Sequence, residues 1–264
     1  MHNAVPMSEI TVLELPQTLP PGALLNRDAV HLAGVMAQTG GLWFTARQDA
    51  LLPEGVGPDT ALSGWRSTNG SATLHPSEPN TGNSLFSTHG PRPGLVMREG
   101  VHCGLGLAAA TRISRCFSAG LIYSAPEGDP RTLLSLSTGQ EHNLVFLSDA
   151  DGRLALHARA TGAGVDIPQP TREPGPRLVI FSYDGQELAL HGAGRTARAT
   201  ADLPGLDRGG DLFVGCRSNR RGLLKTLGRS LIHDVFFWPD RAILTEATAS
   251  DLPGLIARYQ RWAI

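Results

Sequence analysis

The stretch RLVIFSYDGQELALH, residues 177–191, decides the fold class of this sequence. Two apolar runs of strand length flank the step Asp184-Gly185. Asp-Gly favours the tight turn of a β-hairpin, because both residues tolerate the positive φ angles that this turn requires. Successive strand residues point to opposite faces, so the alternation in Leu-Ala-Leu-His places both leucines on one face. The stretch therefore predicts an antiparallel hairpin with one apolar face.

The same pattern occurs in NLVFLSDADGRLALH, residues 143–157, where Asp151-Gly152 precedes a second Leu-Ala-Leu-His. No longer period connects the two hairpins, so they do not indicate a repeat protein. Many short strands separated by turn residues predict an all-β domain. The other strand-length runs are Arg112–Tyr123, Thr132–Ser137, Thr196–Ala201, Leu212–Cys216 and Ser230–Trp238.

The composition agrees with this class. The 264 residues include 31 Gly and 19 Pro, and only 18% are charged, which excludes a coiled coil or helical bundle. An apolar fraction of 41% is enough for a core and argues against disorder. The net charge of −1 gives no reason to expect nucleic acid or an anionic membrane as a partner. Residues 51–100, rich in Gly, Pro, Ser, Thr and Asn, predict short edge strands with long exposed loops.

Residues 1–40 are predicted to form an N-terminal arm or attachment segment ahead of a domain at 41–264. They contain a strand-like piece at Ile10–Leu15, the chain-breaking Pro16, Pro20 and Pro21, and a short helical pattern at Leu24–Met36. The alternative is that they form the first strand and loop of the domain itself. The N-terminus lacks the basic and apolar regions of a signal peptide, and no run reaches the ~20 apolar residues of a membrane helix. We expect synthesis in the cytoplasm without a signal peptide, and no membrane insertion.

A short helix is predicted at the C-terminus, over Ser250–Trp262, with Ser250 as its N-cap. Apolar side chains recur at helical spacing and share one face. They are Leu252, Leu255, Ile256 and Tyr259. This helix is expected to cap one end of the β-sandwich.

Motifs for cofactors and metals are missing from the sequence. It has no phosphate-binding G-x-x-x-x-G-K-[ST], no G-x-S-x-G nucleophile elbow and no His/Cys spacing typical of zinc. Cys103, Cys116 and Cys216 are odd in number and far apart, which favours buried apolar side chains over a disulfide framework. We therefore predict no cofactor and no metal.

A glycosidase needs two carboxylates that face each other across the scissile bond. No predicted strand carries such a pair on one face, which predicts a non-enzymatic protein. The alternative, a glycoside hydrolase or lyase acting on a polysaccharide, takes its acids from separate strands, with Asp234 and Glu187 as the first pair to test. Four histidines on or beside strands have no nucleophile in their own motifs and are interpreted as half-exposed residues. They are His142, His157, His191 and His233.

Basic side chains gather around one predicted loop, Arg217–Lys225 (RSNRRGLLK). Arginine suits an anionic glycan, a phosphate or an acidic protein face. The alternative is a solvated loop. No aromatic residue is interleaved with the arginines to stack on bases, so nucleic acid is not expected. The basic residues of this cluster are Arg208, Arg217, Arg220, Arg221, Lys225 and Arg229.

The predicted contact surface combines this loop with Trp65. The indole lies among Gly, Ser and Asn, where an exposed ring would stack on a sugar while Arg and Asn bond its hydroxyls. The alternative is that Trp65 packs beneath its own loop, since Trp is usually buried. The predicted carbohydrate-binding residues are Trp65, His142, Asn143, Arg217, Asn219, Arg220 and Arg221.

Five segments, in order, resemble the concanavalin A-like lectin/glucanase superfamily in its laminin G-like branch. They are GLWFTARQDALL (41–52), LSGWRSTNG (62–70), FSYDGQELAL (181–190), LFVG (212–215) and GRSLIHDVFFW (228–238). Thr45 and Ser67 stand where the family commonly has acidic residues, and its calcium-binding positions and paired glycosidase acids are not recognisable. The resemblance implies a two-sheet antiparallel jelly roll that binds glycans or proteins.

Such jelly rolls are also similar to domains in appendages of tailed phages and gene transfer agents, which are assembled in the cytoplasm and released by lysis. The resemblance therefore implies a non-enzymatic structural or attachment protein of a phage-like particle: a head spike, fibre or tail appendage. Its arm would bind particle structural proteins, and its jelly roll would bind cell-surface polysaccharide or a neighbouring subunit, with a homo-oligomer left open. The alternative without a ligand is a structural linker between particle proteins.

Overall fold

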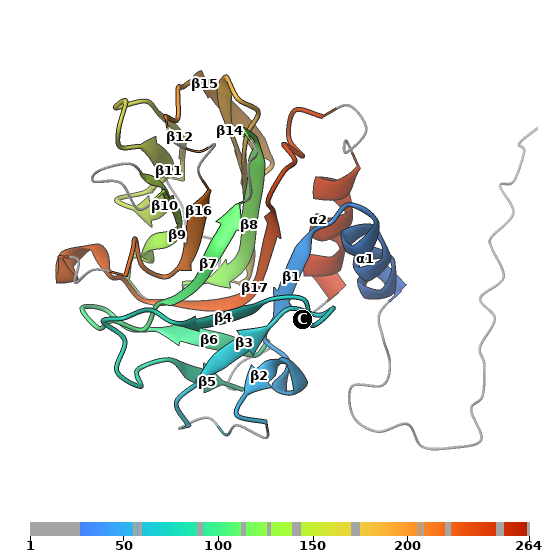
Figure 1. Ribbon diagram of the computed structural model, residues 1–264, viewed down its shortest axis with the longest axis vertical. Helices are drawn as coiled ribbons and strands as arrows, with labels where there is room; N and C mark the ends of the chain where they lie inside the picture. Colours follow the sequence, from blue (N-terminus) through green and yellow to red (C-terminus); the bar gives the residue numbers. More distant parts are fainter. Residues whose placement is uncertain are drawn as a thin grey trace, which may run out of the picture.

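The computed structural model describes residues 27–54, 57, 60–88, 92–111, 115–125, 128–138, 144–169, 175–204, 206, 209–219, 223–246 and 251–262. They form two antiparallel β-sheets packed face to face, with helices against one of them (Figure 1). The predicted class, an all-β two-sheet sandwich with a short C-terminal helix, is confirmed.

The two sheets contain eight and nine strands in the described part of the chain. In the eight-stranded sheet the order is β15 (Arg195–Thr200), β14 (Glu187–Gly192), β13 (Arg177–Tyr183), β8 (Phe117–Ser124), β17 (Ser230–Trp238), β6 (Gly94–Met97) and β5 (Leu85–Ser87), while β1 (Leu42–Thr45) also pairs with β17. In the nine-stranded sheet it is β12 (Gly164–Pro168), β11 (Arg153–Ala158), β10 (Leu144–Ala150), β9 (Arg131–Ser137), β16 (Gly210–Val214), β7 (Leu105–Thr111), β4 (Thr73–Pro76), β3 (Gly64–Arg66) and β2 (Leu51–Leu52). Because the late strands β16 and β17 lie in the middle of the sheets, neither sheet is complete until the chain is almost finished.

The two Asp-Gly hairpins form, but their turns differ. Asp151 and Gly152 have φ angles of 53° and 70°, as the predicted two-residue turn between β10 and β11 requires. Between β13 and β14 only Gly185 has a positive φ, 102°, and Asp184 instead accepts hydrogen bonds from the next backbone N–H groups. The leucines of both Leu-Ala-Leu-His motifs are fully buried between the sheets, as their alternation predicts. They are Leu154, Leu156, Leu188 and Leu190.

The predicted short edge strands of residues 51–100 are present as β2 to β6, each of two to four residues. They extend the edges of both sheets, because β2, β3 and β4 continue the nine-stranded sheet and β5 and β6 continue the eight-stranded one.

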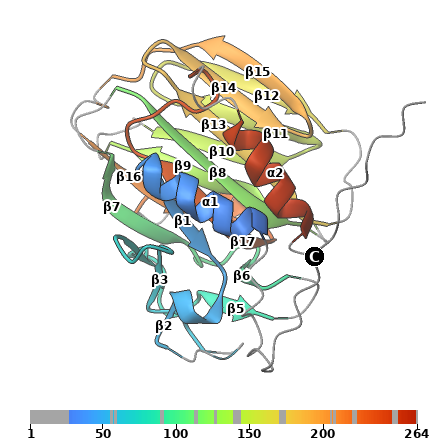
Figure 2. The same ribbon diagram turned by 90° about the vertical axis from the view of Figure 1, so that its right-hand side faces the viewer.

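Two helices, α1 (Arg27–Gln38) and α2 (Leu252–Trp262), lie side by side on the outer face of the eight-stranded sheet (Figure 2). The prediction that the C-terminal helix caps one end of the sandwich is wrong: its buried residues Leu255 and Ile256 pack with Ile180 and Phe236, which point out of that sheet. The short helix predicted from Leu24 is present as α1. Within the described chain, no helix has the length and apolar character needed to cross a bilayer.

The described end of the predicted arm, residues 27–40, is packed on the jelly roll through α1. Leu32 and Met36 are almost fully buried in the layer that α1 forms with α2 and the sheet. Residues 1–26, which include Ile10–Leu15, lie outside the described residues, as does the predicted N-cap Ser250.

A buried carboxylate on β17 connects these outer elements to the sheet. Asp234 is fully buried and accepts hydrogen bonds from Trp43 Nε1 of β1 at 2.8 Å and from the Tyr259 hydroxyl of α2 at 3.1 Å. Arg92, which precedes β6, forms an ion pair with Asp234 and donates to the Tyr259 oxygen at 2.8 Å. Removing one partner of a buried pair is costly, because the other charge then stays buried without compensation.

We therefore expect Asp234→Ala to lower the free energy of unfolding by about 3–5 kcal/mol, since it leaves the Arg92 guanidinium buried and unpaired. Urea denaturation measures this loss. The matched control is Glu54→Ala, which breaks the exposed pair with Arg66 and should cost less than ~1 kcal/mol. Equal losses in the two variants would contradict this role of Asp234.

Candidate functional site

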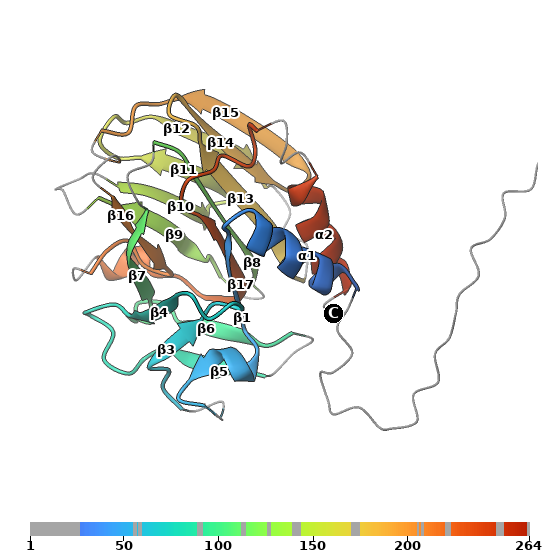
Figure 3. The same cartoon turned by 45° about the vertical axis from the view of Figure 1, so that its right-hand side comes forward.

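The nine-stranded sheet has an outer face that neither described helix covers (Figure 3). Both helices pack on the opposite side of the sandwich, where they bury the outer face of the eight-stranded sheet. A ligand that contacts sheet residues is therefore best accommodated on the nine-stranded side.

An aromatic pair lies on this open face. Phe146 of β10 is directly opposite His157 of β11, and their rings are 5.1 Å apart with planes tilted by 33°. Val145 and Leu147 point inward and are buried, so Phe146 between them points outward and stays half-buried, while His157 is exposed. The pair thus lies on the solvent side of the sheet, with His157 as its exposed ring.

Arg217, in the loop after β16, is held above this pair. The Ser135 hydroxyl of β9 donates to the Arg217 carbonyl oxygen at 2.9 Å, which brings the loop back over the sheet. Arg217 Nε donates to Thr132 Oγ1 at 3.1 Å, and the guanidinium carbon lies 3.8 Å from the centre of the Phe146 ring. This cation–π contact and the hydrogen bonds fix the side chain, while its two terminal nitrogens bond to no other described residue.

A hollow of about 330 Å³ adjoins Arg217 and lies within the size range of ligand pockets. The hollow is lined by acidic and basic side chains. Among the basic ones, Lys225 is exposed, while Arg131 is paired with Glu99 at 2.7 Å. Its lining residues are Asp129, Arg131, Ser148, Ala150, Asp151, Arg217, Lys225 and Thr226.

The electrostatics of this surface favour a neutral histidine beside a cation at pH 7. Partial desolvation lowers the pKa of His157 and the Arg217 charge lowers it further, against a smaller opposite effect of Asp166. Burial and the charge of Arg159 likewise lower the pKa of Arg217. The surface therefore presents a fixed guanidinium next to an uncharged imidazole.

One of the sequence-predicted residues, Arg217, belongs to this surface and forms its centre. Asn219 lies further along the same loop, but its side-chain oxygen accepts from the backbone N–H of Glu78, which follows β4, at 3.3 Å. The predicted residues His142, Asn143, Arg220 and Arg221 lie outside the described residues.

Trp65 does not belong to the surface. Its exposed fraction is 0%, its Nε1 donates to the Thr45 carbonyl at 2.8 Å, and its ring packs edge-on against Phe44. The prediction of an exposed sugar platform at Trp65 is therefore wrong, because core residues distant in sequence cover the indole. The alternative of a buried indole describes its position, with Phe44 and Thr45 of β1 among the residues that contact it.

Sequence reasoning missed Phe146 and set His157 aside. The signal was the alternation in LVFLS: an inward Val145 and Leu147 require Phe146 on the polar face, and the hairpin register places His157 opposite. The interpretation of the strand histidines as half-exposed was wrong for His233. This residue is 2% exposed, and its two ring nitrogens form hydrogen bonds with the Ser124 hydroxyl and the Pro93 carbonyl.

The carboxylate pair of the enzyme hypothesis does not form. Asp234 is enclosed beneath the helices, and Glu187 is paired with Arg198 on the neighbouring strand. Their strands, β17 and β14, are separated by β13 and β8, which places them about 14 Å apart at ordinary strand spacing. This exceeds the roughly 5–10 Å that glycosidase acids need. Within the described ranges, no three His, Cys, Asp or Glu side chains group as metal ligands would.

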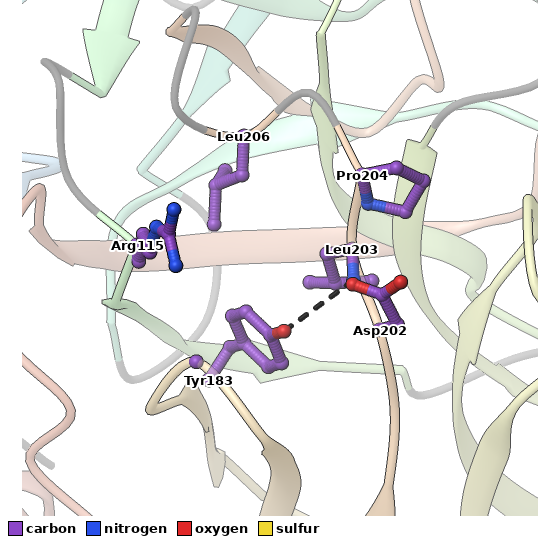
Figure 4. A pocket seen from close by; sticks show the side chains of 7 residues that line it. Arg115, Tyr183, Asp202, Leu203, Pro204 and Leu206 are labelled. Atoms are coloured by element: carbon purple, nitrogen blue, oxygen red, sulfur yellow. Dashed lines mark hydrogen bonds between the residues drawn. The ribbon is translucent and has the colours of Figure 1, made fainter.

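A second hollow, of about 240 Å³, lies where the segment after β15 passes towards the other sheet. Figure 4 shows Arg115 and Asp202 on opposite sides of Tyr183. Burial raises the pKa of Tyr183, and its hydroxyl is already engaged, since it accepts from the Leu203 N–H and donates to the Ala201 carbonyl, both at 3.3 Å. This hollow offers a ligand neither an exposed ring nor a fixed arginine.

Known proteins with the same fold are found among solved structures, whereas no family model and no curated protein matches the sequence. Domain 4 of AbnA, a GH43 extracellular arabinanase from Geobacillus stearothermophilus solved in complex with arabinotriose, aligns with a TM-score of 0.54 at 13% identity, over 81% of this chain and 96% of that one. The botulinum neurotoxin serotype C1 binding domain aligns with a TM-score of 0.53 at 9% identity, over 83% and 52%. The NanB sialidase of Streptococcus pneumoniae aligns at 16% identity with a TM-score of 0.43 over 52% of this chain, and the alignment spans only 24% of that enzyme.

At these identities the likeness establishes the fold alone. That fold is a two-sheet antiparallel jelly-roll sandwich, which the arabinanase domain and the toxin binding domain share with this chain.

We expect Trp65→Ala to destabilise the protein by about 3–5 kcal/mol, as truncation of a buried aromatic does. Thermal unfolding followed by circular dichroism measures the loss. A variant that keeps wild-type stability would mean that the indole is not a core residue.

Proposed function

We propose that this chain is a non-catalytic carbohydrate-binding jelly roll whose ligand lies on the outer face of the nine-stranded sheet. The observation that carries the proposal is Arg217, fixed over Phe146 beside an open hollow on the helix-free side. The solved complex of the arabinanase domain with arabinotriose supports it by likeness of fold.

The chemistry of the surface suits a saccharide. Sugar rings present apolar C–H faces that stack on aromatic rings, and the exposed His157 ring offers such a face beside Phe146, whose own ring carries the Arg217 guanidinium. Sugar hydroxyls both donate and accept, and the adjoining hollow supplies the Arg217 guanidinium, the Ser148 hydroxyl and the Asp151 carboxylate. A few placed polar groups beside an apolar surface are typical of small-ligand sites.

For the biological setting we propose a phage-like particle, with the jelly roll as an attachment module for cell-surface polysaccharide. The motif resemblance supports this setting. Immunogold labelling and co-sedimentation of the full chain with particles from producing cells test it. Absence of the chain from purified particles would overturn the setting and leave the binding proposal unaffected. Particle association without binding to any glycan or cell would instead favour the structural linker.

Phe146→Ala should weaken binding to whichever oligosaccharide a glycan array selects by about 1–3 kcal/mol, taking base–aromatic stacking as the closest guide. Calorimetric titration measures the change, and thermal unfolding shows that the variant is folded. Val30→Ala, an exposed position on α1, serves as the control and should leave binding unchanged. If a folded Phe146→Ala protein binds as tightly as wild type, the aromatic pair is not the sugar surface.

A further inference from the structure

We infer that the ligand is an anionic saccharide whose carboxylate is bound by the terminal nitrogens of Arg217, and that His157 strengthens this binding as the pH falls. The inference rests on the proposed function and specifies the class of ligand at the same site.

Arg217 is held in one geometry. Its Nε donates to Thr132 and the face of its guanidinium lies over the Phe146 ring, so that among the described residues nothing occupies its two terminal nitrogens. A planar guanidinium presenting two parallel N–H groups matches the two oxygens of a carboxylate or phosphate, and such paired bonds are stronger than bonds to neutral acceptors. Because the side chain is already fixed, binding costs little additional conformational entropy.

The positive charge of Arg217 is not neutralised by an ion pair. Arg159 is close enough to lower the pKa of Arg217, and neither guanidinium forms an ion pair with a described carboxylate. Of the acids nearby, Asp166 is bound by Arg153 at 3.2 Å and Asp129 accepts from the Asp151 backbone N–H, while the exposed Asp151 lines the same hollow as Arg217. Two neighbouring cations repel each other, and an anion bound at Arg217 relieves that repulsion.

His157 packs against the same Phe146 ring that carries the Arg217 guanidinium. The groups that face it are Phe146 on β10, Arg217 from the loop after β16, and Asp166 on β12. Its pKa lies below the ordinary value, so the ring is mostly uncharged at pH 7 and gains a proton in more acidic solution. A bound carboxylate favours the protonated ring, so by linkage a falling pH tightens binding of an acid and not of a neutral sugar.

The experiment compares three probes by calorimetry on the full chain: trigalacturonic acid, its methyl ester and a phosphorylated galactose. The acid and its ester share the sugar framework and differ in charge. We expect the acid to bind at least about 10-fold more tightly than the ester at pH 7, from the greater strength of hydrogen bonds to charged groups. Tight binding of the phosphorylated sugar but not of the acid would assign the anion as phosphate and overturn the carboxylate.

Two Arg217 variants test the paired bond. Arg217→Gln should remove the preference for the acid over the ester, and Arg217→Lys, which keeps the charge but loses the planar donor pair, should remove most of it. Arg195→Gln, an exposed arginine on the edge strand β15, is the control and should change neither. Circular dichroism shows whether each variant is folded, and Arg217→Lys keeps the test valid if the glutamine variant is not.

The pH arm compares binding at pH 7.5 and pH 5.5. The acid should bind more tightly at pH 5.5, the ester should not change, and His157→Gln should abolish the difference. Equal affinity for acid and ester, or a pH dependence that persists in His157→Gln, would overturn the inference. Equal binding of acid and ester would leave the proposed function standing, whereas failure of every saccharide on a broad array would remove the proposed function as well.

Discussion

The Asp234 carboxylate, enclosed on the central strand β17, constrains the arrangement of the whole molecule. A buried charge must be paired and hydrogen-bonded, and its partners come from β1, from the segment before β6 and from α2. These elements must therefore gather on the same face of the eight-stranded sheet, where α1 joins α2 in covering Phe236 and Trp238. Hydrogen bonds and apolar packing thus close the outer face of the eight-stranded sheet, whereas the described helices leave the outer face of the nine-stranded sheet uncovered.

The open face acquires its chemistry from a loop that folds back on it. Ser135, fully buried on β9, holds the chain at Cys216 and Arg217, and Phe213 and Cys216 are buried with Leu227 beneath the same loop. This packing fixes the backbone, so that the Arg217 side chain reaches Thr132 and the Phe146 ring. The site is thus part of the folded sandwich, with its aromatic pair on adjacent strands and its cation supported from a third.

The sequence predicted those elements of the fold whose structure depends on residues adjacent in the chain. The alternation in Leu-Ala-Leu-His, the Asp-Gly steps and the apolar face of α2 each depend on neighbours in the chain, and each matches an observed element. Trp65 could not be placed in this way, because its burial comes from Phe44 and Thr45, which local composition does not reveal. Phe146 was missed because it lies in the uninterrupted apolar run LVFL (144–147), where every position suits the core, whereas the register opposite His157 shows that its ring points outward.

The most direct test of this account is amide chemical-shift mapping of the full chain during titration with an acidic oligosaccharide. The account predicts shift changes concentrated in β10, β11 and residues 216–219, with the helices and the Tyr183 hollow unchanged. Shift changes confined to that hollow, or to the segment around residues 45–70, with the outer face of the nine-stranded sheet unaffected, would contradict it.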